Sequence, residues 1–190
     1  MDAYNVLEML SPDPHLQIIK DNMRHGVPDI RTVLAYFAHA HAPARYLEIG
    51  VRRGISMAMV ASQAPDCVMV GVDMWIADYG GNDNPGPDFV RAELKKVNPL
   101  VDVTLLTGDS KVIVPLLTEP FDLILIDGDH SYAGTLADLN NCAPLISNRL
   151  VIDDLNDPEV ERAWNEWREH RDSDYLFERI GPVGIATKRK

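Results

Sequence analysis

The sequence predicts an α/β fold, in which helices cover both faces of a largely parallel sheet that ends in an antiparallel hairpin. Two observations lead to this prediction. Short apolar runs alternate with longer amphipathic stretches, and the runs are nearly continuous in Val, Ile and Leu, as in strands buried on both faces. The runs, which we expect to be strands, cover residues 46–49, 67–72, 101–106, 121–126 and 150–152.

Length and composition predict one domain. The chain has 190 residues, 46% of them hydrophobic, which is enough for a substantial core. It contains no internal repeat or low-complexity tract. We therefore expect a single domain over residues 1–190, with a helical cap over 1–44 and the sheet-containing core over 45–190. A Gly-Val-Pro sequence at residues 26–28 predicts a break within the cap.

Charge and hydropathy exclude several classes of function. With 18 basic and 29 acidic residues, a net charge of −11, the chain lacks a broad basic face for nucleic acid or anionic lipid. No apolar run approaches the roughly 18 residues of a membrane helix. Acidic residues precede the first basic one, Lys20, unlike in a secretory signal. Cys67 and Cys142 show no metal-ligand spacing, so we expect free, buried thiols and a cytoplasmic protein.

The stretches between the apolar runs have helical length, at residues 54–63, 89–97, 132–144 and 158–171. Asp109 and Ser110 can cap a helix after the third run, and Asp157 before Pro158 gives an N-cap with proline at the first helical position. Further on, residues 175–180 and 184–188 flank a Gly-Pro pair and predict the hairpin.

A long loop is expected over residues 77–88, which are rich in Gly, Pro and Asn and favour neither regular element. Loops of this length are usually functional or disordered. Two interpretations stay open, namely a lid or substrate loop at the mouth of a site and a flexible connection.

A glycine turn follows the first predicted strand. Glu48, Gly50 and Gly54 form an E-x-G-x-x-x-G pattern that leads into a helix. Gly50 lets the backbone turn sharply, and Ser56 adds a hydroxyl near a helix N-terminus, which favours an anion. Two arginines lie between the glycines, so the turn differs from the dinucleotide fingerprint. This favours a small carboxylate over a pyrophosphate.

The next two strands end in acidic residues. Asp73 follows the second strand at the position where an acid commonly accepts hydrogen bonds from ribose hydroxyls. Asp109 and Ser110 follow the third strand, where they can flank an adenine. Because the carboxyl ends of parallel strands share one edge of the sheet, the three residues predict a nucleoside-containing ligand.

Three carboxylates end the fourth and fifth strands, Asp127 on one and Asp153 and Asp154 on the other. Carboxylates that converge in one cleft repel each other unless a proton, a hydrogen bond or a cation intervenes. Oxygen ligands suit Mg²⁺, Mn²⁺ or Ca²⁺, which predicts a divalent-metal site at this edge. The alternative is that these residues cap helices and turns.

Residues 45–154 and the terminal hairpin resemble class I S-adenosylmethionine-dependent methyltransferases, especially metal-dependent O-methyltransferases of the catechol and macrolide-sugar types. The resemblance implies a Rossmann-like, seven-stranded sheet in the order 3-2-1-4-5-7-6. In such enzymes N-terminal helices cover the site, which would bring Met23, Arg24 or Gly26 near cofactor or substrate. Those helices often form dimers, which leaves a homodimer open.

The resemblance also assigns roles to single residues. Glu48 and its neighbours would hold the methionine end of the cofactor, Asp73 its ribose, and Met74 its adenine. Asp127 would lie near the methionine amino group as well as in the metal set. The implied cofactor-binding residues are Glu48, Gly50, Val51, Gly54, Ser56, Asp73, Met74, Asp109, Ser110 and Asp127. The implied metal ligands are Asp127, Asp153 and Asp154.

A base must accept the proton of the methylated hydroxyl. His130, three residues after Asp127, has a suitable intrinsic pKa, and Asp129 is the second candidate. Catechol enzymes carry lysine in the place of His130, so a small polyhydroxylated acceptor such as a sugar or natural product is favoured over a catechol. Two other functions stay open: a cofactor-binding protein without transfer activity, and a different enzyme on the same scaffold, such as a hydroxylase-like relative.

Overall fold

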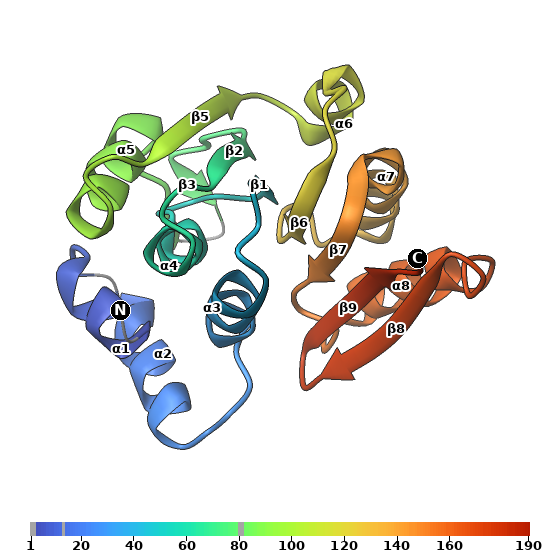
Figure 1. The fold of residues 1–190 in the computed structure, drawn as a ribbon, viewed down its shortest axis with the longest axis horizontal. Coiled ribbons are helices and arrows are strands. Elements are labelled where there is room, and N and C mark those ends of the chain that lie inside the picture. The colour runs from blue at the N-terminus through green and yellow to red at the C-terminus, as the bar shows by residue number, and fades with distance from the viewer. Residues whose placement is uncertain (1–2, 13, 80–81) are drawn as a thin grey trace.

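The protein is described by a computed structural model, which covers residues 3–12, 14–79 and 82–190. A seven-stranded sheet runs through the molecule (Figure 1) in the order β5-β2-β1-β6-β7-β9-β8, which is the predicted order 3-2-1-4-5-7-6. The strands are β1 Arg45–Ile49, β2 Val68–Asp73, β5 Asp102–Thr107, β6 Phe121–Ile126, β7 Ile146–Ile152, β8 Tyr175–Ile180 and β9 Val183–Lys188.

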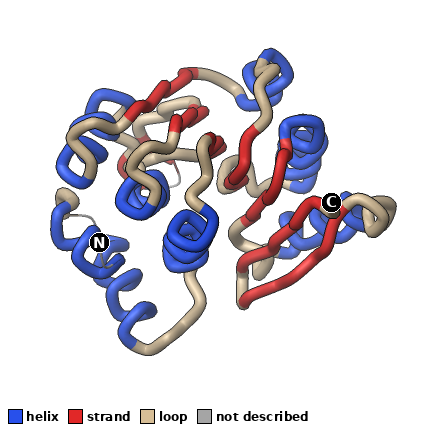
Figure 2. The backbone as a smooth tube through the Cα atoms, in the orientation of Figure 1, coloured by secondary structure: helices blue, strands red, loops and turns tan. Residues whose placement is uncertain are grey.

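The strand directions also agree with the prediction. Strands β5, β2, β1, β6 and β7 pair in parallel. Strand β9 pairs antiparallel with both β7 and β8. In Figure 2 the β8–β9 hairpin lies at the side of the molecule away from β5. The α/β class, the mostly parallel sheet and the terminal hairpin are therefore confirmed.

Helices cover both faces of the sheet. They are α1 Ala3–Met9, α2 Pro14–Arg24, α3 Ile30–His41, α4 Ile55–Gln63, α5 Pro87–Val97, α6 Ser110–Ile113, α7 Tyr132–Cys142 and α8 Pro158–Arg168. Alternate strand residues face opposite sides, so Tyr46 packs with α1 to α5 and Leu47 with α6 to α8. Burial on both faces explains the nearly continuous apolar runs. Among the described residues, no helix is long and apolar enough to span a membrane.

Several boundaries differ from the prediction. The fifth strand of the sheet begins at Ile146, four residues before the predicted start, because Ser147 and Asn148 extend it with polar residues at the sheet's end. The helix α7 ends at Cys142 and continues as a 3-10 turn, Ala143–Leu145, that contains a proline. Helix α8 ends at Arg168, not at residue 171.

The loop over residues 77–88 contains a short antiparallel pair, β3 Asp78–Tyr79 with β4 Asn82–Asp83. This corrects the expectation of no regular structure there, since two residues on each side suffice for a minimal hairpin. Residues 80–81 of the predicted loop lie outside the described residues. The cap breaks between α2 and α3, around residues 26–28, as predicted.

Candidate functional site

The glycine turn after β1 brings two strand ends into direct contact. Gly50 has φ +86°, and a Cβ on it would stand 1.8 Å from the carbonyl oxygen of Asp127. Its amide donates to Val72 O at 3.0 Å, and the amide of Asp127 donates to Ile49 O at 2.9 Å. The absence of a side chain at position 50 therefore lets the β1 turn lie against the end of β6.

Asp73 holds this turn from the end of β2. Its Oδ2 accepts hydrogen bonds from the amides of Val51, at 2.9 Å, and Arg52, at 2.8 Å. Its Oδ1 accepts from the amide of Trp75, at 2.6 Å, and from Nδ2 of Asn84, at 3.0 Å. Four donors fill the acceptor positions of one carboxylate. Asp73 thus links the β1 turn to the loop over residues 77–88.

Glu48 lies beneath the turn, in β1. It is buried, and its Oε2 accepts the hydroxyl of Tyr46 at 2.6 Å. Burial, together with the nearby charge of Asp127, raises the pKa of Glu48 well above its ordinary value, although the bond from Tyr46 opposes the shift. Burial therefore favours the protonated, uncharged form of this side chain.

Asp127, His130 and Asp154 form one cluster at the ends of β6 and β7. One ligand atom from each of the three lies within 4.8 Å of the other two. His130 Nε2 is 3.7 Å from Asp127 Oδ1 and 3.5 Å from Asp154 Oδ2. These carboxylates, Asp127 first, raise the pKa of His130 to about 9 in spite of its partial burial. Asp154 has φ +59°, a left-handed conformation that Asp tolerates better than most residues.

Asp153 faces a different partner. Its Oδ2 lies 3.9 Å from Nη1 of Arg31, and its Oδ1 accepts the amide of Asp154 at 2.9 Å. Burial and the neighbouring carboxylates Asp127 and Asp154 raise the pKa of Asp153 to about 7. The predicted metal set thus divides, because Asp127 and Asp154 join His130 while Asp153 lies against an arginine.

That arginine, Arg31, comes from the first turn of α3. Asp29 caps the helix by accepting the amide of Arg31 at 2.9 Å, and its other oxygen lies 3.3 Å from Nη1. Burial opposes the charge of Arg31, but Asp29, Asp127 and Asp153 outweigh it and raise the pKa. The cap therefore places a cation beside the carboxylates.

Asp129, the second candidate base, has hydrogen-bonded partners on both oxygens. Its Oδ1 accepts the amide of Ser131 at 3.0 Å, and its Oδ2 accepts from Lys111 Nζ at 3.3 Å. Burial raises its pKa, but these donors outweigh burial and lower the pKa overall. A carboxylate stabilised in this way is a weaker base, which leaves His130 as the better placed candidate.

The predicted adenine-contacting residues surround the start of α6. Asp109 caps that helix by accepting the amide of Lys111 at 2.9 Å. The Ser110 hydroxyl donates to Oδ1 of Asp138, a buried residue of α7, at 2.7 Å. Met74 beside Asp73 is 56% exposed, while Ser56 is buried in the first turn of α4.

Comparison with known proteins places the chain in a family. A family described as a methyltransferase domain matches residues 47–155, which is more than half of the chain and spans β1 to the end of β7. The chain belongs to this family. The comparison with curated protein sequences found no match.

Solved structures share the fold of this methyltransferase. The Podospora anserina methyltransferase PaMTH1, solved with SAH, is 16% identical, with 100% of this chain and 89% of that chain covered and a TM-score of 0.68. The O-methyltransferase NovP is 21% identical over 85% and 78%, with a TM-score of 0.65. TomG, an O-methyltransferase from Streptomyces achromogenes, is 18% identical over 100% and 96%, with a TM-score of 0.65.

Three residues that the sequence analysis did not single out contact predicted site residues: Arg31 lies against Asp153, Asn84 donates to Asp73, and Asp138 accepts from Ser110. Their signals were weak ones, namely an Asp-x-Arg sequence after a break, an amide in a loop, and an acid inside an amphipathic helix. Arg24, which the resemblance would bring near cofactor or substrate, contacts Asp21 and Tyr4 within the cap.

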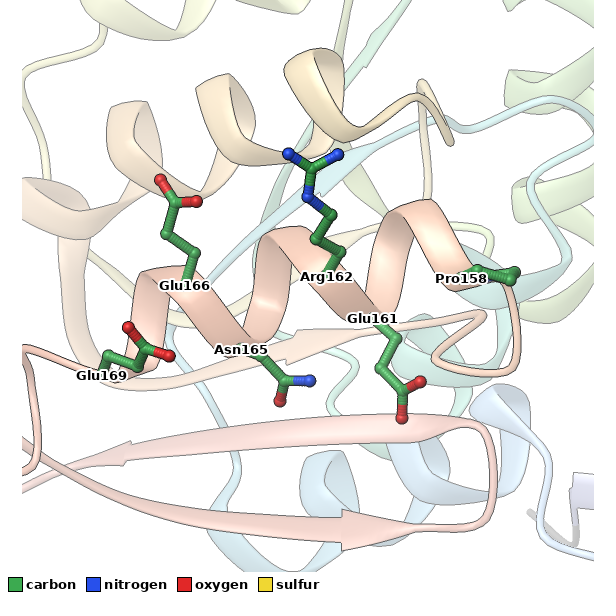
Figure 3. A pocket seen from close by; sticks show the side chains of 6 residues that line it. All are labelled: Pro158, Glu161, Arg162, Asn165, Glu166 and Glu169. Atoms are coloured by element: carbon green, nitrogen blue, oxygen red, sulfur yellow. The ribbon is translucent and has the colours of Figure 1, made fainter.

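Two surface depressions of the methyltransferase lie away from this cluster. One, of about 470 Å³, lies between α3 and the terminal hairpin. The other lies on α8, and its lining residues (Figure 3) are Pro158, Glu161, Arg162, Asn165, Glu166 and Glu169. The guanidinium carbon of Arg162 lies 4.0 Å from the centre of the Tyr132 ring, and Glu166 accepts the Tyr132 hydroxyl. Glu161 in turn pairs with Arg179. Neither depression is lined by a residue of the Asp127, His130 and Asp154 cluster, so the strand ends remain the candidate site.

Proposed function

We propose that the protein transfers a methyl group from S-adenosylmethionine to a hydroxyl of a small polyhydroxylated acceptor, with the help of a divalent cation. The observation that carries this proposal is the cluster of Asp127, His130 and Asp154 at the mouth of a methyltransferase fold. Two of the structurally similar proteins, NovP and TomG, are O-methyltransferases.

The donor set of the cluster fits a divalent cation. The carboxylates of Asp127 and Asp154, whose ligand atoms lie within 4.8 Å of each other and of His130, offer oxygen ligands to Mg²⁺, Mn²⁺ or a similar ion and leave the His130 imidazole to act as the base. Burial and the charge of Asp127 raise the pKa of Asp154, which indicates that the bare carboxylates repel each other. A cation would remove that repulsion. Asp153, held by Arg31, would support the set from behind.

The chemistry that a bound cation supplies is Lewis-acid stabilisation of a deprotonated hydroxyl. In this chain His130 would accept the hydroxyl proton at Nε2, which faces both carboxylates. Asp127 and Asp154, which both face His130, would orient the acceptor oxygen. Since methyl transfer is an in-line displacement, this positioning contributes much of the rate.

The strand ends also fit S-adenosylmethionine, which supplies the methyl group from a positively charged sulfonium. Gly50 opens the backbone beside Asp127, and exposed Met74 can cover an adenine. Negative charge from Asp73 and Asp127 suits the sulfonium and the ammonium of the methionine end.

The identity of the proposed base, His130, favours one class of methyl acceptor. A histidine in place of the lysine of catechol enzymes favours sugar or natural-product hydroxyls, and TomG belongs to tomaymycin synthesis. The compartment that we propose is the cytoplasm. Cys67 and Cys142 are both buried and free, as predicted, which suits a reducing environment.

Isothermal titration with S-adenosylmethionine, in magnesium and in chelator, tests the proposal. We expect 1:1 binding in both buffers and turnover of a hydroxylated acceptor in magnesium alone. Asp127→Asn should lose the magnesium effect, whereas Asp66→Asn, at an exposed position away from the cluster, should keep it. An absence of heat in both buffers would remove the cofactor from the proposal. Equal turnover in magnesium and in chelator would remove the cation.

A further inference from the structure

A buried carboxylate on α7 lies beneath the loop that begins α6. Asp138 is 1% exposed, and its Oδ1 accepts the Ser110 hydroxyl at 2.7 Å. Its Oδ2 is buried and has no hydrogen-bond partner among the described residues. A Cβ on Gly128 would stand 3.6 Å from this oxygen, so the carboxylate also lies beside the loop after β6.

The position of α6 needs such support. The helix has only four residues, Ser110–Ile113, and a helix this short has no independent stability. Two polar contacts connect it to the segment around α7: the Ser110 hydroxyl with Asp138, and Lys111 Nζ with Asp129 at 3.3 Å. The second contact is exposed and therefore weak. The contact of Ser110 with Asp138 is the one removed from water.

We propose that Asp138 is a positioning residue of the cofactor site, which holds Ser110 and with it the first turn of α6 against α7. This inference rests on the proposed function, because that turn follows β5, at the edge where the adenine would bind. The positioning role of Asp138 also changes the role that we expect for Ser110. The sequence predicts a hydroxyl that contacts the cofactor, whereas the hydroxyl in the structure is donated to a buried carboxylate.

Because of where Asp138 lies, losing its carboxylate should weaken cofactor binding as well as local packing. Its carboxylate lies between the loop that would contact adenine and the loop of Gly128, which follows the candidate metal ligand Asp127. Loss of the carboxylate would free the Ser110 hydroxyl and let the β5–α6 loop move away from the ligand. The expected effect falls on cofactor affinity, while the rate at saturating cofactor stays nearly unchanged.

A double-mutant cycle tests the coupling, with S-adenosylhomocysteine as the titrated probe. Ser110→Ala and Asp138→Leu should each weaken its binding roughly tenfold, the size expected for one hydrogen bond to a charged group. The double variant should bind no more weakly than Asp138→Leu. Asp138→Asn should restore binding to within about threefold, because the amide oxygen can still accept the Ser110 hydroxyl. Additive losses, or wild-type affinity in Asp138→Leu, would overturn the proposal.

Hydrogen exchange without ligand separates this inference from the proposed function. The amides of Val112 and Ile113 donate to Asp109 O, both at 3.0 Å, and report whether α6 is formed. In Asp138→Leu they should exchange at least about tenfold faster, and in Asp138→Asn at nearly the wild-type rate. Unchanged exchange would overturn the positioning role. If wild-type protein failed to bind the probe but exchange responded as described, the cofactor assignment would fail and the positioning of α6 would stand.

Discussion

At the scale of single residues, the charge state of His130 depends on its neighbours. Its pKa of about 9, raised by Asp127 and Asp154, lies above the ordinary 6.5, so the ring is protonated at neutral pH when no cation is bound. A protonated imidazole can neither accept a proton nor bind a metal. A cation held by Asp127 and Asp154 would repel the protonated ring, lower the pKa of His130 and favour release of this proton.

Nuclear magnetic resonance titration of the histidine ring checks this coupling. In chelator, His130 should titrate near pH 9, and magnesium should shift that midpoint to a lower pH. The signals of His39, at the exposed end of α3, should not respond to magnesium. A His130 midpoint that is the same in both buffers would show that the imidazole and the cation do not share the cluster.

Asp73 should be more important for stability than a ligand-binding residue usually is. Asp73→Ala leaves the amides of Val51, Arg52 and Trp75 without their acceptor, and we expect unfolding to become easier by about 3 kcal/mol. Asn84→Ala removes only one donor and should cost about 1 kcal/mol. Denaturant unfolding measures both, and equal stabilities would mean that the turn does not depend on this carboxylate.

At the scale of elements, the contact between the β1 turn and the β6 end leaves no room for a side chain at position 50. Gly50→Ala should destabilise the protein by about 3 kcal/mol, because its Cβ would overlap the Asp127 carbonyl. Gly26→Ala is the matched control: it has φ +65° but open space around it, so only the backbone strain of about 1 kcal/mol remains. Thermal unfolding of both variants distinguishes overlap from strain.

The sequence predicted elements well where they are buried on both faces. Strand β6 has its predicted bounds, 121–126, because its apolar residues alternate between two covered faces. The sequence analysis missed the start of β7, because Ser147 and Asn148 are polar and lie at a register irregularity between the pairs Phe121–Ile146 and Leu123–Arg149. The β3–β4 pair also escaped prediction, because two-residue strands have no periodicity to detect.

Predictability of the site follows the same logic. Residues at strand ends, such as Asp127 and Asp154, were predictable because topology alone brings them to one edge. Arg31 was not, since its approach depends on how α3 packs against the sheet. The pairing of Asp153 with Arg31 follows from that packing. Tertiary packing decides which carboxylates lie next to His130, and the residue types alone do not determine this.

At the scale of the whole molecule, the acidic cluster should make stability depend on pH. The pKa values of Asp153, about 7, and of His130, about 9, are raised above their ordinary values of 3.8 and 6.5. Groups with raised folded-state pKa values stabilise the fold at low pH and lose that contribution as pH rises through those values. In chelator, the melting temperature should therefore fall between about pH 6 and pH 9.

Magnesium should reverse that loss, because a cation replaces the protons that the cluster gives up. The measurement is a melting curve at pH 6 and at pH 9, with magnesium and with chelator, on wild-type protein and on Asp154→Asn. The variant should show a smaller pH dependence and a smaller magnesium effect. A melting temperature that magnesium leaves unchanged at pH 9 would contradict the cation site.

The order of the strands has a consequence for synthesis on the ribosome. Strand β9 lies between β7 and β8, although it follows both of them along the chain. While residues up to 180 have emerged, β7 is an open edge and β8 has no neighbour, so Trp164 and Trp167 lack their complete packing. An open edge invites pairing with another nascent chain. Arrival of residues 183–188 fills the place between β7 and β8, so these six residues close the open edge of β7.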